Sequence, residues 1–282
     1  MFVSCISLES EGNKMHQSYI YDIRTSADAL GTLVNFTKVI PPIWERYFSR
    51  IRDYQYTEDL VEDVIRTHGC FPDNYEKWIF TYFHVTTSAN GCASFKKHGL
   101  LDLKNSYRCA DSELRIFLDS KGIEIDIDNC FLRYKHKEYD ISYGKCPSGF
   151  DSVARSCWAI GRKFYYDYTT CGFLSVWDLS PYGGNVHCRP EILSDIDNLL
   201  NLTLSQEWYI SHKPYEIVAL VNGTDIVYDG DDEQSDRDKI LNYLTKAYNT
   251  AFGSPHEEII LLKNHIQIPP HNIIDISPLR YW

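Results

Sequence analysis

The sequence of 282 residues contains no apolar run that approaches the roughly 20 residues needed to cross a bilayer. Residues 1–6 lack the basic start and the long apolar stretch of a secretory signal. Basic side chains are scarce, with 28 against 39 acidic ones and a net charge of −11. A field of this sign repels nucleic acid unless a local basic groove overrides it. We therefore expect a soluble, cytoplasmic protein without strong nonspecific binding to DNA.

Several common catalytic signatures are also missing. The chain has no G-x-S-x-G, P-loop, H-E-x-x-H or G-x-G-x-x-G pattern, which excludes the easily recognised hydrolases, nucleotide-triphosphate enzymes, zincins and Rossmann dehydrogenases. Its nine cysteines form no C-x-x-C pair, a distribution that fits reduced thiols better than a disulfide framework or a zinc cage. A cysteine nucleophile such as Cys157 or Cys188 is a minor alternative, and the acidic run at 229–233 predicts a solvated loop.

The sequence does have the content of a folded globule. Hydrophobic residues make up 44% of the chain and aromatic residues 14%, at a length close to the upper limit of one core. Residues 26–69 carry apolar side chains at helical spacing and predict three helices, the first capped by Ser26 or Asp28 and ended by Pro41-Pro42. We expect residues 1–76 to form a helical N-terminal subdomain.

From residue 77 onward, short β-rich runs alternate with helical patterns. Helices are predicted at residues 94–98, 111–118, 190–200, with Pro190 in the first turn, and 240–253. Strands are predicted at 80–87, 216–221, 224–228, 259–262 and 273–276, with a hairpin turn at Asn222-Gly223. Residues 119–150 are poorly patterned and are interpreted as an insertion. The expected fold class is α+β, with residues 77–282 as the second domain.

Polar groups stand at the ends of two of these strands. His84 and Thr86 follow the apolar residues of the run at 80–87, and a short helix then ends at Gly99. Glu258 opens the later apolar run at 259–262. Side chains at the end of an apolar strand are offered to a cleft rather than to the core, so both groups are candidates for a binding site.

These segments resemble the core motifs of ADP-ribosyltransferases. The first comprises residues 83–87, a helix, and residues 97–101, and the second comprises residues 257–262 with 268–273 behind them. The likeness covers residues 77–103 and 250–277 and is closest to the toxin-type and phage-defence enzymes that modify nucleic acid. It implies a split, mostly antiparallel sheet with flanking helices, and NAD in the cleft between the halves.

The resemblance also implies roles for individual residues. His84 would hold a ribose hydroxyl of NAD, the Val85 backbone would bind the nicotinamide amide, and Thr86 would support both. Glu258 would be the catalytic residue that stabilises the oxocarbenium ion and helps to deprotonate the acceptor. Nicotinamide leaves as a neutral ring, so the protein must supply position and negative charge, and no metal is required.

The choice of carboxylate rests on strand register. Glu257 would face the opposite side of the strand from Glu258, because side chains alternate with a period of two. The E-x-E pattern of arginine-modifying relatives is absent, since His256 stands at its first position. This absence argues mildly against arginine as the acceptor.

An aromatic residue that stacks on nicotinamide is expected from residues 161–167, which are similar to a glycine-basic-aromatic stretch of the polymerase branch. Tyr165 is the candidate, with Tyr166, Tyr168 and Tyr182 as alternatives. Residues 182–189 form either a phosphate-facing loop with Arg189 or an ordinary turn.

The activity expected from the resemblance is transfer of ADP-ribose from NAD to a macromolecule, with RNA or DNA favoured over protein. Such an enzyme would act as a toxin or anti-phage effector, with an antitoxin or inhibitor protein as a further partner. One alternative is an NAD glycohydrolase that depletes NAD. Another is a non-enzymatic binding or antitoxin-type protein, because a histidine or glutamate beside an apolar strand also fits an ordinary structural role.

Overall fold

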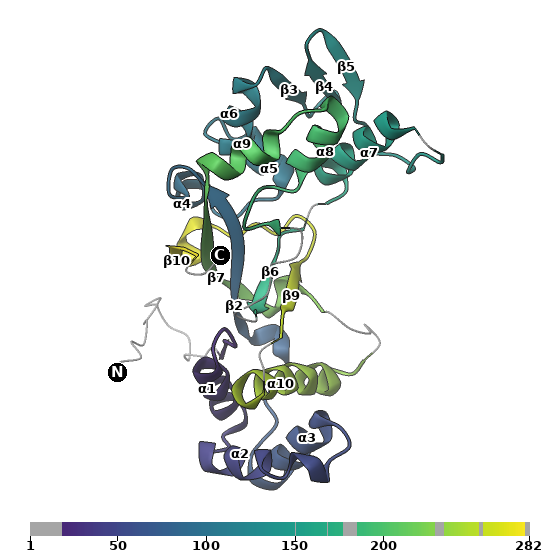
Figure 1. Cartoon of the computed structure of the whole chain (residues 1–282). Coiled ribbons are helices and arrows are strands. Elements are labelled where there is room, and N and C mark those ends of the chain that lie inside the picture. Colours follow the sequence, from purple (N-terminus) through teal and green to yellow (C-terminus); the bar gives the residue numbers. More distant parts are fainter. Residues whose placement is uncertain are drawn as a thin grey trace, which may run out of the picture.

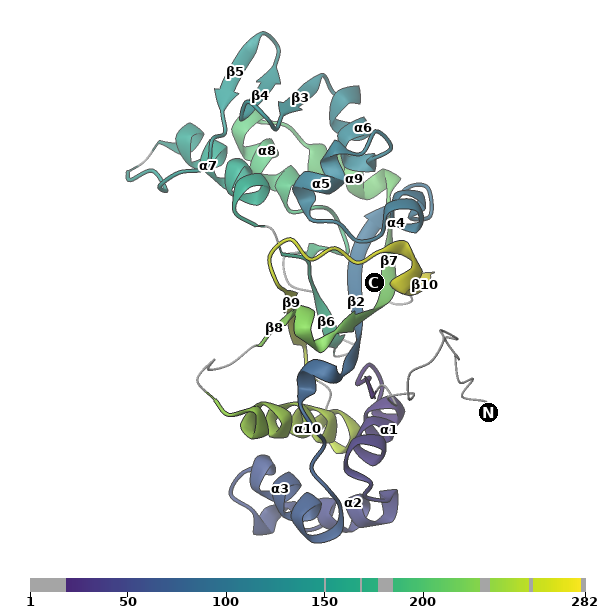
Figure 2. The ribbon, with the colours of Figure 1, turned by 180° about the vertical axis from the view of Figure 1, so that it is seen from behind.

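A seven-stranded sheet stands in the middle of the molecule, with helices on one side of it and a smaller α/β lobe on the other (Figures 1 and 2). The structure is a computed structural model that describes residues 19–149, 151–167, 169–176, 185–228, 234–253 and 256–279. None of the described helices combines the length and apolar character needed to cross a membrane.

The central sheet has the strand order β10-β7-β2-β6-β9-β8, and β1 pairs with β2. Its strands are β1 (Ile20–Tyr21), β2 (Ile79–Ser88), β6 (Cys171–Ser175), β7 (Lys213–Asn222), β8 (Ile226–Val227), β9 (Glu258–Leu262) and β10 (Ile273–Pro278). Every strand pair is antiparallel except β1 with β2. The predicted mixed fold with a mostly antiparallel sheet is confirmed.

The helical part consists of α1 (Ser26–Thr37), α2 (Pro41–Phe48), α3 (Thr57–His68) and α10 (Asp236–Phe252). The three helices predicted for residues 26–69 are confirmed, but Thr25 caps the first, and Pro41-Pro42 begins the second helix rather than ending the first. Proline suits a first helical turn because the N–H that it lacks would be unpaired there. Helix α10, from late in the chain, packs on α1 and α3 (Figure 1).

Helices and sheet share one core rich in aromatic side chains. Phe36 of α1 packs edge-on against Trp78 at a centroid distance of 4.4 Å, and Phe80 of β2 lies 5.0 Å from Tyr243 of α10. All four side chains are buried. The N-terminal helices are therefore continuous with the core of the central sheet.

The lobe has a core of its own. It contains α5 (Leu103–Arg108), α6 (Glu113–Ser120), a small sheet of β3 (Ile123–Asp126), β4 (Phe131–Tyr134) and β5 (Lys137–Asp140), then α7 (Ser152–Tyr165), α8 (Ile192–Leu200) and α9 (Leu204–Ser211). Leu118, Ile123 and Phe164 are among its buried residues. Residues 119–150 supply the small sheet, and the whole lobe lies between β2 and β7 in sequence, with β6 returning to the central sheet.

Short elements complete the described chain. They are α4 (Ala93–His98) and the 3₁₀ turns η1 (Ile51–Asp53), η2 (Tyr75–Lys77), η4 (Gly223–Asp225) and η5 (Pro270–Asn272). The predicted helices at 94–98, 111–118, 190–200 and 240–253 correspond to α4, α6, α8 and α10, but α8 begins at Ile192, so Pro190 precedes the helix rather than lying in its first turn.

The predicted hairpin at Asn222-Gly223 is wrong. Strand β7 pairs with β10 and β2, whereas β8 pairs with β9. Gly223 opens a 3₁₀ turn and donates its N–H to Trp78 O at 2.8 Å. A Cβ at this position would lie 2.3 Å from Tyr75 O, so glycine is required for close packing rather than for a hairpin turn.

Candidate functional site

A cavity of about 280 Å³ lies between the central sheet and the lobe. Its walls come from the end of β2, the segment that contains α4 to α6, the chain before β6, and the turn before α8. Residues 84–87 of β2 form one wall, and Val186, Arg189 and Pro190 contribute to another. The lining includes polar and charged groups among apolar ones, which is typical of ligand pockets.

The position of this cavity follows from strand pairing. Strand β2 pairs with β7 along its whole length but with β6 at Phe83. Among the described strands, residues 84–87 therefore pair with β7 only. These are the residues of β2 that line the cavity. The end of β2 thus has no strand partner on its β6 side among the described residues, and this is the side of the sheet to which the cavity belongs.

His84 is oriented by a backbone carbonyl of the neighbouring strand. Its Nδ1 lies 2.8 Å from Cys171 O, and because a carbonyl oxygen can only accept, Nδ1–H is the donor. Burial lowers the pKa of His84, and the hydrogen bond to Cys171 opposes that shift. In the neutral ring, Nε2 carries a lone pair that can accept a hydrogen bond from a ligand hydroxyl.

Val85 and Thr86 line the same cavity as His84. The Val85 side chain is buried with Phe83, Phe173 and Val218 on one face of the sheet. Thr86 is partly buried and, by the period of two, shares the His84 face. The three consecutive residues that are predicted to contact NAD thus all line the cavity.

Glu258 has different surroundings. It is the first residue of β9, as expected, but its carboxylate forms an ion pair with Lys246 of α10 at 2.7 Å. Strand β6 lies between β2 and β9, and two strand spacings amount to about 10 Å. Glu258 is not part of the cavity wall that contains His84. The expected meeting of these two groups across one hollow is therefore not found.

Tyr165 is also placed away from the cavity. It is the last residue of α7, and its hydroxyl donates to Ile127 O at 2.7 Å within the lobe. The alternative Tyr166 is 66% exposed and stacks on Tyr143. Tyr168 and Tyr182 lie outside the described residues.

Sequence reasoning missed two carboxylates of the cavity wall, Asp102 and Glu113. Asp102 caps α5, accepting from Asn105 N and Asn105 Nδ2 at 2.8 Å each. Glu113 accepts from Ser88 Oγ at 2.6 Å and from Ala89 N at 2.7 Å. No local pattern predicts that these two carboxylates line the cavity, because their position depends on how the lobe packs against the end of β2.

Arg189 brings positive charge to the cavity. It follows a turn in which Cys188 N and Arg189 N both donate to Asn185 O, at 2.8 and 3.2 Å. This turn is the described part of residues 182–189, and its side chains at 186 and 189 line the cavity. The cavity can therefore offer a neutral histidine at one wall and a guanidinium at another.

No protein-family model, curated protein or solved structure matches this chain.

Proposed function

We propose that the chain binds NAD in the cavity between sheet and lobe and transfers ADP-ribose from it. The observation that carries the proposal is that His84, Val85 and Thr86 line this cavity. They directly follow Phe83, the residue at which β2 pairs with β6. These are the three positions to which the resemblance assigns contacts with ribose and nicotinamide.

The chemistry available at these residues fits a dinucleotide. His84 Nε2 can accept a hydrogen bond from a ribose hydroxyl while Nδ1–H stays on Cys171 O. Arg189 can pair with the diphosphate, because a guanidinium matches the geometry of phosphate oxygens. During transfer, the bond between ribose C1′ and nicotinamide breaks, and its electron pair leaves with nicotinamide as a neutral ring. The acceptor nucleophile then forms the new bond to C1′ and releases its proton to a base or to solvent.

Glu258, the carboxylate that the resemblance makes catalytic, lies outside the cavity wall. A direct role for Glu258 would require its ion pair with Lys246 to open and β9 to move relative to β6. The carboxylates already at the cavity are Asp102 and Glu113, and both accept hydrogen bonds from protein groups. The assignment of Glu258 therefore continues to rest on the resemblance.

The acceptor class and the cellular role rest on the same resemblance. It favours nucleic acid over protein, and action as a toxin or anti-phage effector, although the net charge of −11 provides no general attraction for nucleic acid.

Incubation with NAD labelled in its adenosine part tests the proposal. A transferase places label on added RNA, DNA or protein, and at NAD concentrations below the wild-type Kd the variant His84→Ala lowers the labelling roughly 10- to 100-fold. His271→Ala, at an exposed histidine of η5, is the matched control and keeps it. Release of free ADP-ribose alone would indicate a glycohydrolase. Absence of both products would contradict NAD chemistry at this site.

A further inference from the structure

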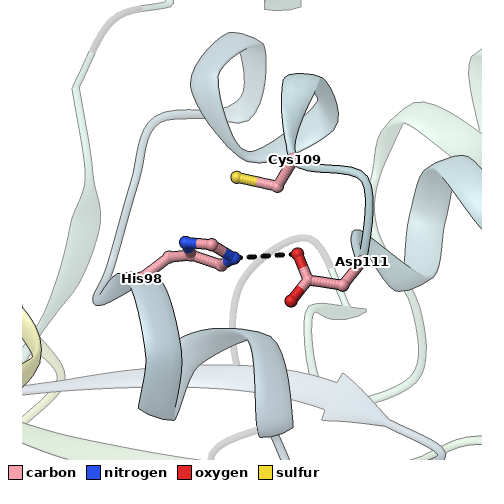
Figure 3. A group of neighbouring side chains, drawn as sticks. All are labelled: His98, Cys109 and Asp111. Atoms are coloured by element: carbon pink, nitrogen blue, oxygen red, sulfur yellow. Dashed lines mark hydrogen bonds and ion pairs between the residues drawn. The ribbon is translucent and has the colours of Figure 1, made fainter.

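Three side chains of different chemistry meet beside α4, outside the cavity wall (Figure 3). His98 is the last residue of α4, Cys109 directly follows α5, and Asp111 lies two residues before α6 begins. Each offers one metal-ligating atom, and these atoms lie within 4.8 Å of one another. All three residues are partly buried. The spacing of His98, Cys109 and Asp111 matches no familiar metal-binding motif, so sequence patterns do not predict this cluster.

The backbone holds the first of these residues rigidly. Gly99 follows His98 at φ +82°, and a Cβ there would lie 2.0 Å from Ile268 O. Leu100 and Ile268 then exchange backbone hydrogen bonds of 2.9 and 3.0 Å. The backbone next to His98 is therefore held by contacts that do not involve Cys109 or Asp111.

The other two residues share a tight turn. Cys109 N donates to Ser106 O at 3.2 Å, and Ser112 N donates to Cys109 O at 3.1 Å. This turn brings the thiol and the carboxylate to the same side, facing the His98 ring (Figure 3). The three groups are thus assembled by the fold before any ligand binds.

We propose that His98, Cys109 and Asp111 form a mononuclear zinc site whose fourth position is open to water. Nitrogen, sulfur and oxygen ligands are the set that Zn²⁺ takes in proteins, at bond lengths of about 2.0–2.3 Å. Such bonds imply ligand atoms roughly 3–4 Å apart in a tetrahedron. Small side-chain shifts from the present separations achieve this.

Binding requires a defined movement of protons. The hydrogen bond between His98 Nε2 and Asp111 Oδ1, now 2.8 Å long, is replaced by metal bonds to both atoms. Because the Asp111 carboxylate can only accept, His98 Nε2 carries the proton in this hydrogen bond, and metal binding requires that proton to leave Nε2, either for Nδ1 of the same ring or for solvent. Cys109 releases its thiol proton to solvent. Lys97 Nζ contacts the other oxygen, Oδ2, at 3.0 Å, so Oδ1 is available and the carboxylate remains oriented.

A cysteine nucleophile would need a different arrangement. In such a site the imidazole lies between thiol and carboxylate and contacts both. Here the imidazole contacts the carboxylate, but the Cys109 thiol donates to Asn105 O at 3.5 Å rather than to His98. The arrangement therefore fits a metal better than thiol catalysis. A bound metal would also stabilise the turn from Cys109 to Ser112. Ser112 and Glu113, at the end of this turn, line the cavity.

Titration of the chelator-stripped full chain with Co²⁺, without NAD, tests this inference. We expect one Co²⁺ per chain, with a near-ultraviolet thiolate-to-cobalt band that Zn²⁺ abolishes. Cys109→Ser should remove that band and weaken Zn²⁺ binding by more than about tenfold. Asp111→Asn should keep the band while weakening binding. Cys130→Ser, at another partly buried thiol of the lobe, is the matched control and should change neither.

Circular dichroism of each metal-free variant verifies that it is folded. Three results would overturn the inference: no stoichiometric Zn²⁺ binding at micromolar concentration, a thiolate band that survives Cys109→Ser, or a band that Cys130→Ser removes. Because no NAD is present, failure of the metal site leaves the proposed function untouched, and the converse also applies.

Discussion

His84 is the residue on which the proposed cofactor contacts depend. Replacing it with alanine removes both the bond to Cys171 O and the Nε2 acceptor at the cavity. A lost hydrogen bond that leaves its partner unsatisfied costs about 1–3 kcal/mol, so we expect the Kd for NAD to rise roughly 10- to 100-fold. Isothermal titration calorimetry measures this change. An equal loss in the His271→Ala control would show that the effect is not local.

The same residue predicts a pH dependence. Burial lowers the pKa of His84 below its ordinary value of 6.5, so the folded protein binds fewer protons than the unfolded chain near that pH. The contribution of the neutral His84 ring to the free energy of unfolding is complete above pH 6.5, and it is lost as the pH falls through the lowered pKa of the folded state.

Urea unfolding at several pH values between 7.5 and 5 should therefore show a shallower loss of stability in His84→Gln than in the wild type. His187 and His212 also have lowered pKa values because of burial, but both proteins contain them. Identical slopes for the two proteins would contradict a neutral, buried His84.

At the scale of elements, Glu258 and Lys246 connect β9 to α10. Their side chains are 22% and 16% exposed, so the pair is well shielded from water. Hydrogen bonds to charged groups contribute about 1.5–3 kcal/mol, and we expect Glu258→Gln to lower the free energy of unfolding by roughly this amount. Because Glu258 lies outside the cavity wall, the variant should bind NAD as the wild type does.

Urea unfolding and calorimetry of one Glu258→Gln preparation measure both quantities. A large loss of NAD affinity without loss of stability would place this carboxylate at the cofactor, contrary to the described contacts.

Some of the helices and strands could be predicted from sequence patterns, and others could not. Helices α1, α3 and α10 could be predicted because apolar periodicity and end signals are local. The hairpin prediction failed because the contacts that Gly223 makes with Tyr75 and Trp78 come from elsewhere in the chain. Strand β6 has five residues, and its place between β2 and β9 depends on tertiary pairing. That placement separates Glu258 from His84, which no local pattern could reveal.

At the scale of the whole molecule, the cavity lies between two cores, one in the sheet and helices and one in the lobe. Hydrogen bonds connect the two parts beside the cavity. Trp208 Nε1 of the lobe donates to Thr87 Oγ1 of β2 at 2.8 Å, and Glu113 accepts from Ser88 Oγ. A ligand held by β2 and Arg189 would connect both parts, and so would stabilise them together.

Thermal unfolding with increasing NAD measures this coupling. At a concentration of 100 times Kd, ligand binding adds about 2.7 kcal/mol to the free energy of unfolding. We expect a single transition that shifts upward in the wild type and shifts much less in His84→Ala at the same NAD concentration. A wild-type transition that NAD does not move would contradict binding to the native state.

A crystal structure of the chain grown with NAD tests most directly whether the cavity between the sheet and the lobe binds the dinucleotide. We expect density for NAD in the cavity, with a ribose hydroxyl at His84 Nε2 and the diphosphate beside Arg189. An empty cavity at saturating NAD, or the dinucleotide bound elsewhere, would contradict it.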